Sequence, residues 1–140
     1  MRASQTMELK TLKINYEDER GMIMDILTHV DLQHATLLTS KTGSFRGDHY
    51  HKFSGQYTFL LDGELKYVSR NRRTNKVEVV TMKPHELAFS PPEEEHGFVA
   101  IKDSTILVLT YGPRGGEDYE RDTYRLSPDE SLKRFIDQIP

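Results

Sequence analysis

The chain has 140 residues, close to the usual length of one domain, and we expect a single domain over residues 1–140. Apolar residues make up 36% and charged residues 29%, which is typical of a globular protein and excludes a disordered one. The formal net charge of -3 attracts neither nucleic acid nor an anionic membrane, so neither is an expected partner. The absence of cysteine excludes disulfides and thiolate chemistry, which leaves histidine to supply bases or metal ligands.

The N-terminal residues predict no targeting segment. Arg2, Lys10 and Lys13 interrupt the apolar residues there, so the continuous apolar region of a secretory signal is missing. No apolar run approaches the roughly 18 residues of a membrane span. We therefore expect a cytoplasmic protein.

Short β-branched and apolar stretches separated by turn residues follow, a pattern typical of an all-β barrel or sandwich. The expected strands cover residues 35–40, 57–61, 65–70, 76–82, 87–90, 97–101 and 105–111. Asp62 and Gly63 predict a tight hairpin between the second and third of these, because type I′ turns need positive φ at both central residues. The polar connection over residues 71–75, with Arg72 and Arg73, is interpreted as a solvated hairpin tip.

The C-terminal residues predict a short helix that starts near Pro128. Ser127 is a candidate N-cap, proline suits the first helical position, and acidic residues follow it. The apolar residues behind this start fall at helical spacing and predict a packing or dimer face: Leu132, Phe135, Ile136 and Ile139.

Two histidines, His49 and His51, stand at positions i and i+2, which on a strand points both imidazoles to one face. With Gln56 they form the run G-x5-H-x-H-x4-Q-x6-G over residues 43–63, which resembles the first motif of the cupin superfamily with glutamine in place of the frequent glutamate. The run PPEEEH, which ends at His96, resembles half of the second cupin motif. The resemblance implies a cupin jelly-roll β-barrel.

A finer resemblance rests on two segments. RGDHYHK over residues 46–52, followed by Gln56, is similar to the signature of the WxcM-like nucleotide-sugar 3,4-ketoisomerases, and its RG-x-H part resembles the related 3,5-epimerases of dTDP-4-keto sugars. The acidic segment over residues 116–122 is similar to the one that ends the barrel in WxcM-like chains. The resemblance implies an isomerase of a nucleotide-linked 4-keto-6-deoxy sugar, in deoxysugar or polysaccharide biosynthesis.

Such an isomerase removes a proton alpha to a ketone, and an imidazole titrates in the required range. The resemblance implies His49 as the base and His51 as a second group on the same face. Tyr111 is our candidate donor to the enolate oxygen. The remaining candidates would bind substrate, with the cations placed for the diphosphate: Arg46, Lys52, Gln56 and His96.

Two other functions remain open. His49, His51, Gln56 and His96 could instead hold a divalent metal for oxygenase or other metal-assisted chemistry. In the WxcM-like group the glutamine belongs to a metal-free site, so the resemblance favours no cofactor. A non-catalytic sugar-binding cupin is the third reading, since Ala35 and Thr36 stand where ketoisomerases tend to carry tyrosines. We also expect a homodimer, with the strand over residues 9–16 crossing to the partner.

Overall fold

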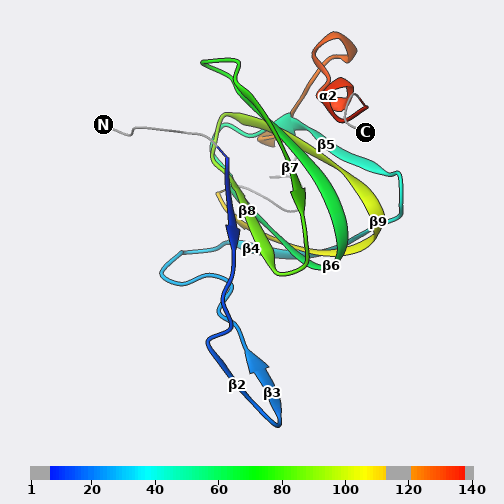
Figure 1. Cartoon of the computed structure of the whole chain (residues 1–140). Coiled ribbons are helices and arrows are strands. Elements are labelled where there is room, and N and C mark those ends of the chain that lie inside the picture. Colours follow the sequence, from blue (N-terminus) through cyan, green and yellow to red (C-terminus); the bar gives the residue numbers. More distant parts are fainter. Residues whose placement is uncertain (1–6, 113–120, 138–140) are drawn as a thin grey trace.

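The computed structural model describes residues 7–112 and 121–137, and most of them lie in strands that curl into a barrel (Figure 1). The strands are β1 (Glu8–Thr11), β2 (Tyr16–Asp18), β3 (Gly21–Ile23), β4 (His34–Ser40), β5 (Phe45–Tyr50), β6 (Gly55–Asn71), β7 (Val77–Met82), β8 (Glu86–Ser90), β9 (Glu94–Tyr111) and β10 (Tyr124–Arg125). A 3-10 turn, η1 (Pro128–Glu130), and a short helix, α2 (Lys133–Asp137), follow. The expected all-β jelly roll with a short C-terminal helix is confirmed.

The barrel is one eight-stranded antiparallel sheet in the order β1-β8-β6-β9-β5-β10, with β4 also paired to β9 and β7 to β6. The strands expected at residues 35–40, 76–82 and 87–90 match β4, β7 and β8 to within one residue at each end. The strands expected at residues 97–101 and 105–111 are two parts of the single strand β9. The two long strands, β6 and β9, pair along their whole length and form the centre of the sheet.

The hairpin expected at Asp62 and Gly63 is wrong. Residues 55–60 and 65–71 both pair with β9 and belong to one bent strand. A type I′ turn needs positive φ at both central residues, and of these two only Gly63 has it, at +107°. Gly63 instead lies at a bend of the strand and packs closely against Ser104, whose hydroxyl would collide with a Cβ at position 63.

Two apolar clusters stabilise the barrel. Ten buried residues form the first, inside the barrel: Met7, Leu60, Leu65, Tyr67, Met82, Ala88, Phe98, Ala100, Ile106 and Val108. A second cluster lies on the outer face of the sheet, where Leu132 and Ile136 of the C-terminal segment cover Val68. The packing role expected for this segment is therefore confirmed for these two residues, whereas Ile139 lies outside the described residues.

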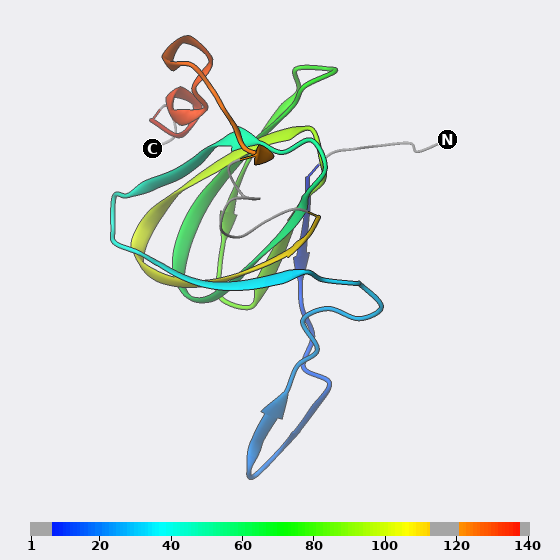
Figure 2. The ribbon, with the colours of Figure 1, turned by 180° about the vertical axis from the view of Figure 1, so that it is seen from behind.

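The small hairpin of β2 and β3 projects away from the barrel, at the end opposite α2 (Figures 1 and 2). Sequence reasoning missed it. Its apolar side chains Tyr16, Met22 and Ile23 are exposed.

Among residues 7–112 and 121–137, no helix is long and apolar enough to cross a membrane.

Candidate active site

A β-bulge in β5 brings Arg46 and His49 to the same interior face. Gly47 lies opposite Gly97 and His49 lies opposite His96, so Asp48 is an extra residue without a partner on β9. Strand residues three apart normally face opposite sides, and one inserted residue reverses that relation. Gly47 has a φ of +90°, and a Cβ there would lie 3.0 Å from the Gly97 Cα, which fits the close approach of the two strands.

Three buried histidines meet inside the barrel. The ring centroids of His49 and His51 are 4.8 Å apart, those of His49 and His96 are 4.9 Å apart, and those of His51 and His96 are 5.4 Å apart. One nitrogen from each ring lies within 4.8 Å of the other two. The structure thus brings together the three histidines that the two sequence motifs indicated.

The tautomer of His51 follows from its contact with the C-terminal segment. Its Nδ1 lies 2.8 Å from the main-chain carbonyl oxygen of Asp122. A carbonyl can only accept a hydrogen bond, so Nδ1 carries a proton, and Nε2 is then the unprotonated nitrogen of the neutral form of the ring. In that neutral form, the lone pair of the His51 ring is on Nε2.

The Asp122 carboxylate holds that carbonyl in place. Its two oxygens accept hydrogen bonds from the backbone N–H groups of Lys52, Phe53 and Ser54, at 2.9–3.3 Å. Asp122 is itself 2% exposed. One residue therefore fixes both the chain that follows His51 and the His51 ring, a role that no local sequence pattern indicated.

His96 is oriented by the last residue of β8 and by a residue of its own strand, β9. Its Nδ1 is 2.9 Å from the Ser90 hydroxyl and 3.3 Å from the main-chain carbonyl oxygen of Glu94. The carbonyl again favours a proton on Nδ1. Tyr67 stacks nearly parallel to His96 at 6.4 Å, and burial raises the pKa of its phenol, so Tyr67 is a neutral wall of the site.

A cavity of about 210 Å³ opens onto this cluster. It is lined by Thr36, Leu37, Leu38, Arg46, Gly47, His49, Gln56, His96, Phe98 and Val108. Cavities that enclose drug-sized ligands measure roughly 300–1,000 Å³, so this one suits a single ring and not a whole nucleotide sugar. Arg46 is fixed at its edge, because Nε donates to the Ser40 hydroxyl at 2.7 Å and Nη2 donates to the Thr39 carbonyl at 3.0 Å.

Lys52 and Tyr111, the other two candidate site residues, do not line this cavity. The Lys52 ammonium lies 4.7 Å from the centre of the Tyr124 ring, and Tyr124 stacks on Tyr50. Because side chains alternate along a strand, Tyr50 points to the face opposite the histidines. Tyr111 covers Gly55 and lies 6.5 Å from Phe89, and it is not among the residues that line the cavity. The phenol that sequence reasoning missed, and that does contact the cluster, belongs to Tyr67.

Residues 72–75 are exposed at the connection between β6 and β7, as expected, but Arg72 also makes specific contacts there. Its guanidinium stacks 3.9 Å from the centre of the Tyr50 ring and pairs with the buried Glu95 at 3.0 Å. Arg70 pairs with the same carboxylate at 2.5 Å. The arginines thus neutralise a buried acid and connect the β6–β7 end to β9, the strand that carries His96.

Glu94 should make stability fall as pH rises. Burial raises the pKa of this carboxyl from 4.5 to about 8, with Glu78 as a smaller cause, and no donor among the described residues reaches its Oε1. The unfolded chain loses this proton near pH 4.5 and the folded chain near pH 8, so the unfolding free energy declines between those values and levels off above them. We expect Glu94→Gln to remove that decline, on the order of a few kcal/mol.

Thermal unfolding at pH 5 and pH 8.5 measures this effect. Glu17→Gln, a substitution of the same charge on the exposed β2, is the matched control. If the parent protein and Glu94→Gln lost the same amount of Tm between the two pH values, the buried carboxyl would not titrate as stated.

The sequence matches no family model and no curated protein. Solved structures match the whole barrel. The dTDP-4-dehydrorhamnose 3,5-epimerase of Sulfolobus tokodaii has a TM-score of 0.76 at 19% identity, over 93% of this chain and 82% of that one. QdtA, a sugar 3,4-ketoisomerase from Thermoanaerobacterium thermosaccharolyticum in complex with TDP, has a TM-score of 0.72 at 21% identity, over 93% and 97%.

ChmJ, a 3'-monoepimerase from Streptomyces bikiniensis in complex with dTDP-quinovose, has a TM-score of 0.72 at 16% identity, over 91% and 74%. At these identities the likeness establishes the fold. The chain has the cupin-like jelly roll that these epimerases and ketoisomerases share.

Proposed function

We propose that the protein is an isomerase of a nucleotide-linked 4-keto-6-deoxy sugar, either a 3,4-ketoisomerase or an epimerase. One observation carries the proposal: a buried His49 lines a cavity of the size of one sugar ring, beside the rings of His96 and His51. This constellation occurs in the fold of the dTDP-sugar epimerases and of QdtA.

His49 is the proposed base because, of His49 and His51, it is the one that lines the cavity. It takes the proton from the carbon alpha to the ketone, and the electron pair of that C–H bond forms the enolate. An imidazole with a pKa of roughly 6.5 suits this step near neutral pH. In its neutral form, His51 supports the charge that His49 gains. In ketoisomerisation the hydroxyl proton of the alpha carbon passes to the enolate oxygen, and the proton on His49 returns to the former carbonyl carbon, so the ketone and the alcohol exchange places. In epimerisation the alpha carbon is protonated again on its other face.

Arg46 is proposed to bind the diphosphate at the cavity edge. Replacing it by alanine should raise KM more than it lowers kcat, because a contact to the non-reacting diphosphate is equally strong in the ground state and the transition state. Steady-state kinetics measures the split. Arg134→Ala, on α2 outside the barrel, is the matched control. A fall in kcat at unchanged KM would remove Arg46 from the diphosphate and assign it to the reacting atoms.

A metal site is the second candidate, and the three-histidine cluster favours it. Nitrogens within 4.8 Å of one another, two of them on rings whose Nδ1 faces a carbonyl, fit the imidazole ligands of Zn²⁺ or Fe²⁺. Gln56 would add a neutral amide oxygen, a weaker ligand than a carboxylate. The metal would supply Lewis-acid or redox chemistry, with the histidines as its ligands.

Metal analysis of the purified protein, beside product formation from thymidine-diphosphate 4-keto-6-deoxyglucose with and without a chelator, separates the candidates. Turnover that the chelator leaves unchanged supports the isomerase. Turnover that requires a bound metal contradicts the metal-free reading. Binding of the nucleotide sugar without turnover would make the protein a non-catalytic sugar-binding cupin.

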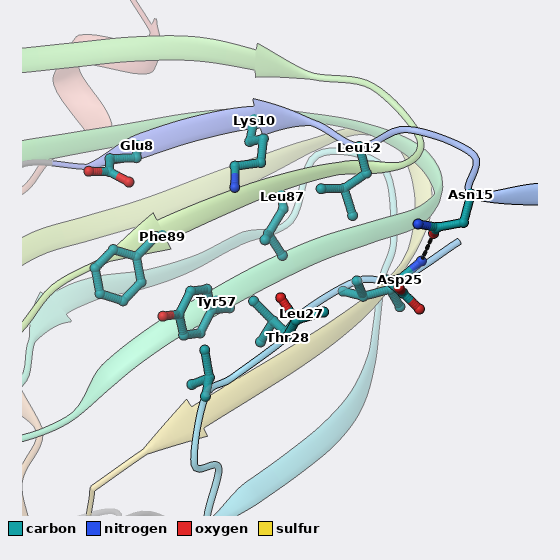
Figure 3. A pocket seen from close by; sticks show the side chains of 12 residues that line it. Glu8, Lys10, Leu12, Asn15, Asp25, Leu27, Thr28, Tyr57, Leu87 and Phe89 are labelled. Atoms are coloured by element: carbon teal, nitrogen blue, oxygen red, sulfur yellow. Dashed lines mark hydrogen bonds between the residues drawn. The ribbon is translucent and has the colours of Figure 1, made fainter. Parts of the chain in front are cut away.

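We further propose a homodimer. Of the strand expected to cross to a partner, residues 9–11 belong to β1 and pair with β8 of the same chain. The β2–β3 hairpin is a better candidate, because isolated two-stranded hairpins are marginally stable and its exposed Tyr16, Met22 and Ile23 gain cover from a second copy. Beside it lies a pocket of about 500 Å³ with an apolar floor of Tyr57, Leu87 and Phe89 (Figure 3).

Light scattering on the purified protein should give twice the 16.2 kDa of one chain. Ile23→Asp should shift the population toward the monomer, because a buried unpaired charge destabilises an interface. Ile101→Asp, at an exposed position of β9, should leave the mass unchanged. A monomeric parent protein would contradict the dimer.

A further inference from the structure

The bulge that aims His49 into the barrel adopts a backbone conformation that needs support. Asp48, its extra residue, has a φ of +66°, in the left-handed region that residues other than glycine seldom occupy. Aspartate and asparagine tolerate that region better than most residues. The local sequence alone therefore permits the bulge but does not hold it.

The C-terminal segment supplies the support. The Asp48 carboxylate accepts a hydrogen bond from the Ser131 hydroxyl at 2.7 Å and another from the Leu132 backbone N–H at 2.8 Å. Its main-chain carbonyl accepts a third from the Leu126 N–H at 3.0 Å. We call these three bonds the tail clasp.

The residues that make the clasp are anchored independently of it. Leu132 is fully buried and Ile136 is 8% exposed, and both pack in the cluster around Val68. Arg70 donates a hydrogen bond to the Glu130 carbonyl at 2.8 Å. The clasp therefore joins the bulge to a fixed part of the outer face of the sheet and not to a loose end.

We propose that Asp48 is a positioning residue, and that the tail clasp holds the bulge that orients His49 toward the cavity. The inference rests on the proposed function for its effect on turnover, but the position of the His49 ring can be measured without it. Arg46 is held separately by Ser40 and Thr39, so loss of the clasp should disturb the base more than the diphosphate contact.

Two substitutions at one position separate the clasp from the backbone conformation. Asp48→Gly accepts positive φ but removes both carboxylate bonds. Asp48→Asn also accepts positive φ, and its amide can still accept from the Leu132 N–H and donate to the Ser131 hydroxyl. We expect Asp48→Gly to lower kcat on the order of 100-fold, the effect of displacing a reacting group by about 1 Å, with a smaller change in KM. Asp48→Asn should stay close to the parent protein.

The histidine-ring signals in ¹H–¹⁵N NMR spectra give the second readout. The His49 signals should shift or broaden in Asp48→Gly and keep their positions in Asp48→Asn. Asn75→Gly, at another positive φ of +63°, controls for the added glycine. If Asp48→Gly does not fold, Ser131→Ala, which removes one bond of the clasp, takes its place with a smaller shift in the same direction.

Unchanged His49 signals in both Asp48→Gly and Ser131→Ala would overturn the proposal, whatever the activity. A parent protein that turns over no nucleotide sugar would end the proposed function, while the ring spectra would still decide whether the clasp orients His49. A shift of equal size in Asp48→Asn would contradict the clasp as well, because that variant keeps its bonds.

Discussion

Replacing His49 by asparagine is expected to lower solvent deuterium exchange into a 4-keto nucleotide sugar by roughly two to four orders of magnitude, the usual contribution of a general base. Asparagine keeps the size and the hydrogen-bonding capacity of the side chain but has no group that titrates near neutrality. Because His49 belongs to neither of the two apolar clusters, the fold should persist, with a Tm close to that of the parent protein.

His85→Asn is the matched control, because His85 lies outside the three-histidine cluster and already adopts a positive φ that asparagine tolerates. Exchange by mass spectrometry and unfolding by circular dichroism are measured on the same preparations. Full exchange activity in His49→Asn would reject His49 as the base and leave His51 or His96 for that role.

Asp122→Ala is expected to lower both stability and kcat. Alanine removes the acceptor for three backbone N–H groups, of which that of Ser54 is in a buried residue and loses its partner without access to water. One buried unsatisfied donor costs about 1–3 kcal/mol. The Asp122 carbonyl remains in the variant, but the segment that carries it is no longer fixed, so His51 loses a defined tautomer and orientation.

Asp122→Asn separates these two effects, because its amide oxygen still accepts hydrogen bonds from the backbone. We expect it to recover most of the lost stability and a larger share of kcat than alanine does. Denaturant titration and steady-state kinetics give the two quantities. If Asp122→Ala lost stability but kept the parent kcat, the contact between Asp122 and His51 would have no part in catalysis.

The pairing of His49 with His51 could be predicted because the i, i+2 spacing is a local property of a strand. The contribution of His96 followed from a motif resemblance, since nothing in its own neighbourhood indicates that β9 runs beside β5. Gln56 lines the same cavity as expected. These predictions depended on alternation along strands, which the barrel preserves.

The hairpin prediction failed, and the predicted role of Tyr111 gained no support, at points that depend on long-range structure. Asp62 and Gly63 have the composition of a hairpin turn, but β9 is long enough to pair with both flanking segments, so the chain bends where it could have reversed. Tyr111 stands on the right strand but packs beside Phe89, because register decides which face a residue occupies.

The roles of Asp122 and Ser131 could not be predicted from the sequence. Of the acidic segment over residues 116–122, residues 116–120 lie outside the described residues, and its resemblance did not indicate what Asp122 contacts. Asp122 contacts His51 just after β5, and Ser131 contacts Asp48 of β5, each from more than 70 residues away along the chain. Aspartate and serine near a chain end are ordinary solvent-exposed residues in most proteins, so only the folded arrangement distinguishes them. The C-terminal segment was predicted to pack against the barrel, and its hydrogen bonds to Asp48 also fix β5, the strand that carries His49.

The position of deuterium in the sugar tests the central claim most directly. Metal-free protein is incubated in D₂O with thymidine-diphosphate 4-keto-6-deoxyglucose, and the recovered sugar is analysed by NMR. Proton abstraction by His49 predicts deuterium on a carbon next to the ketone, at a rate that His49→Asn abolishes. Retention of every carbon-bound hydrogen under conditions where the nucleotide sugar binds would contradict the account.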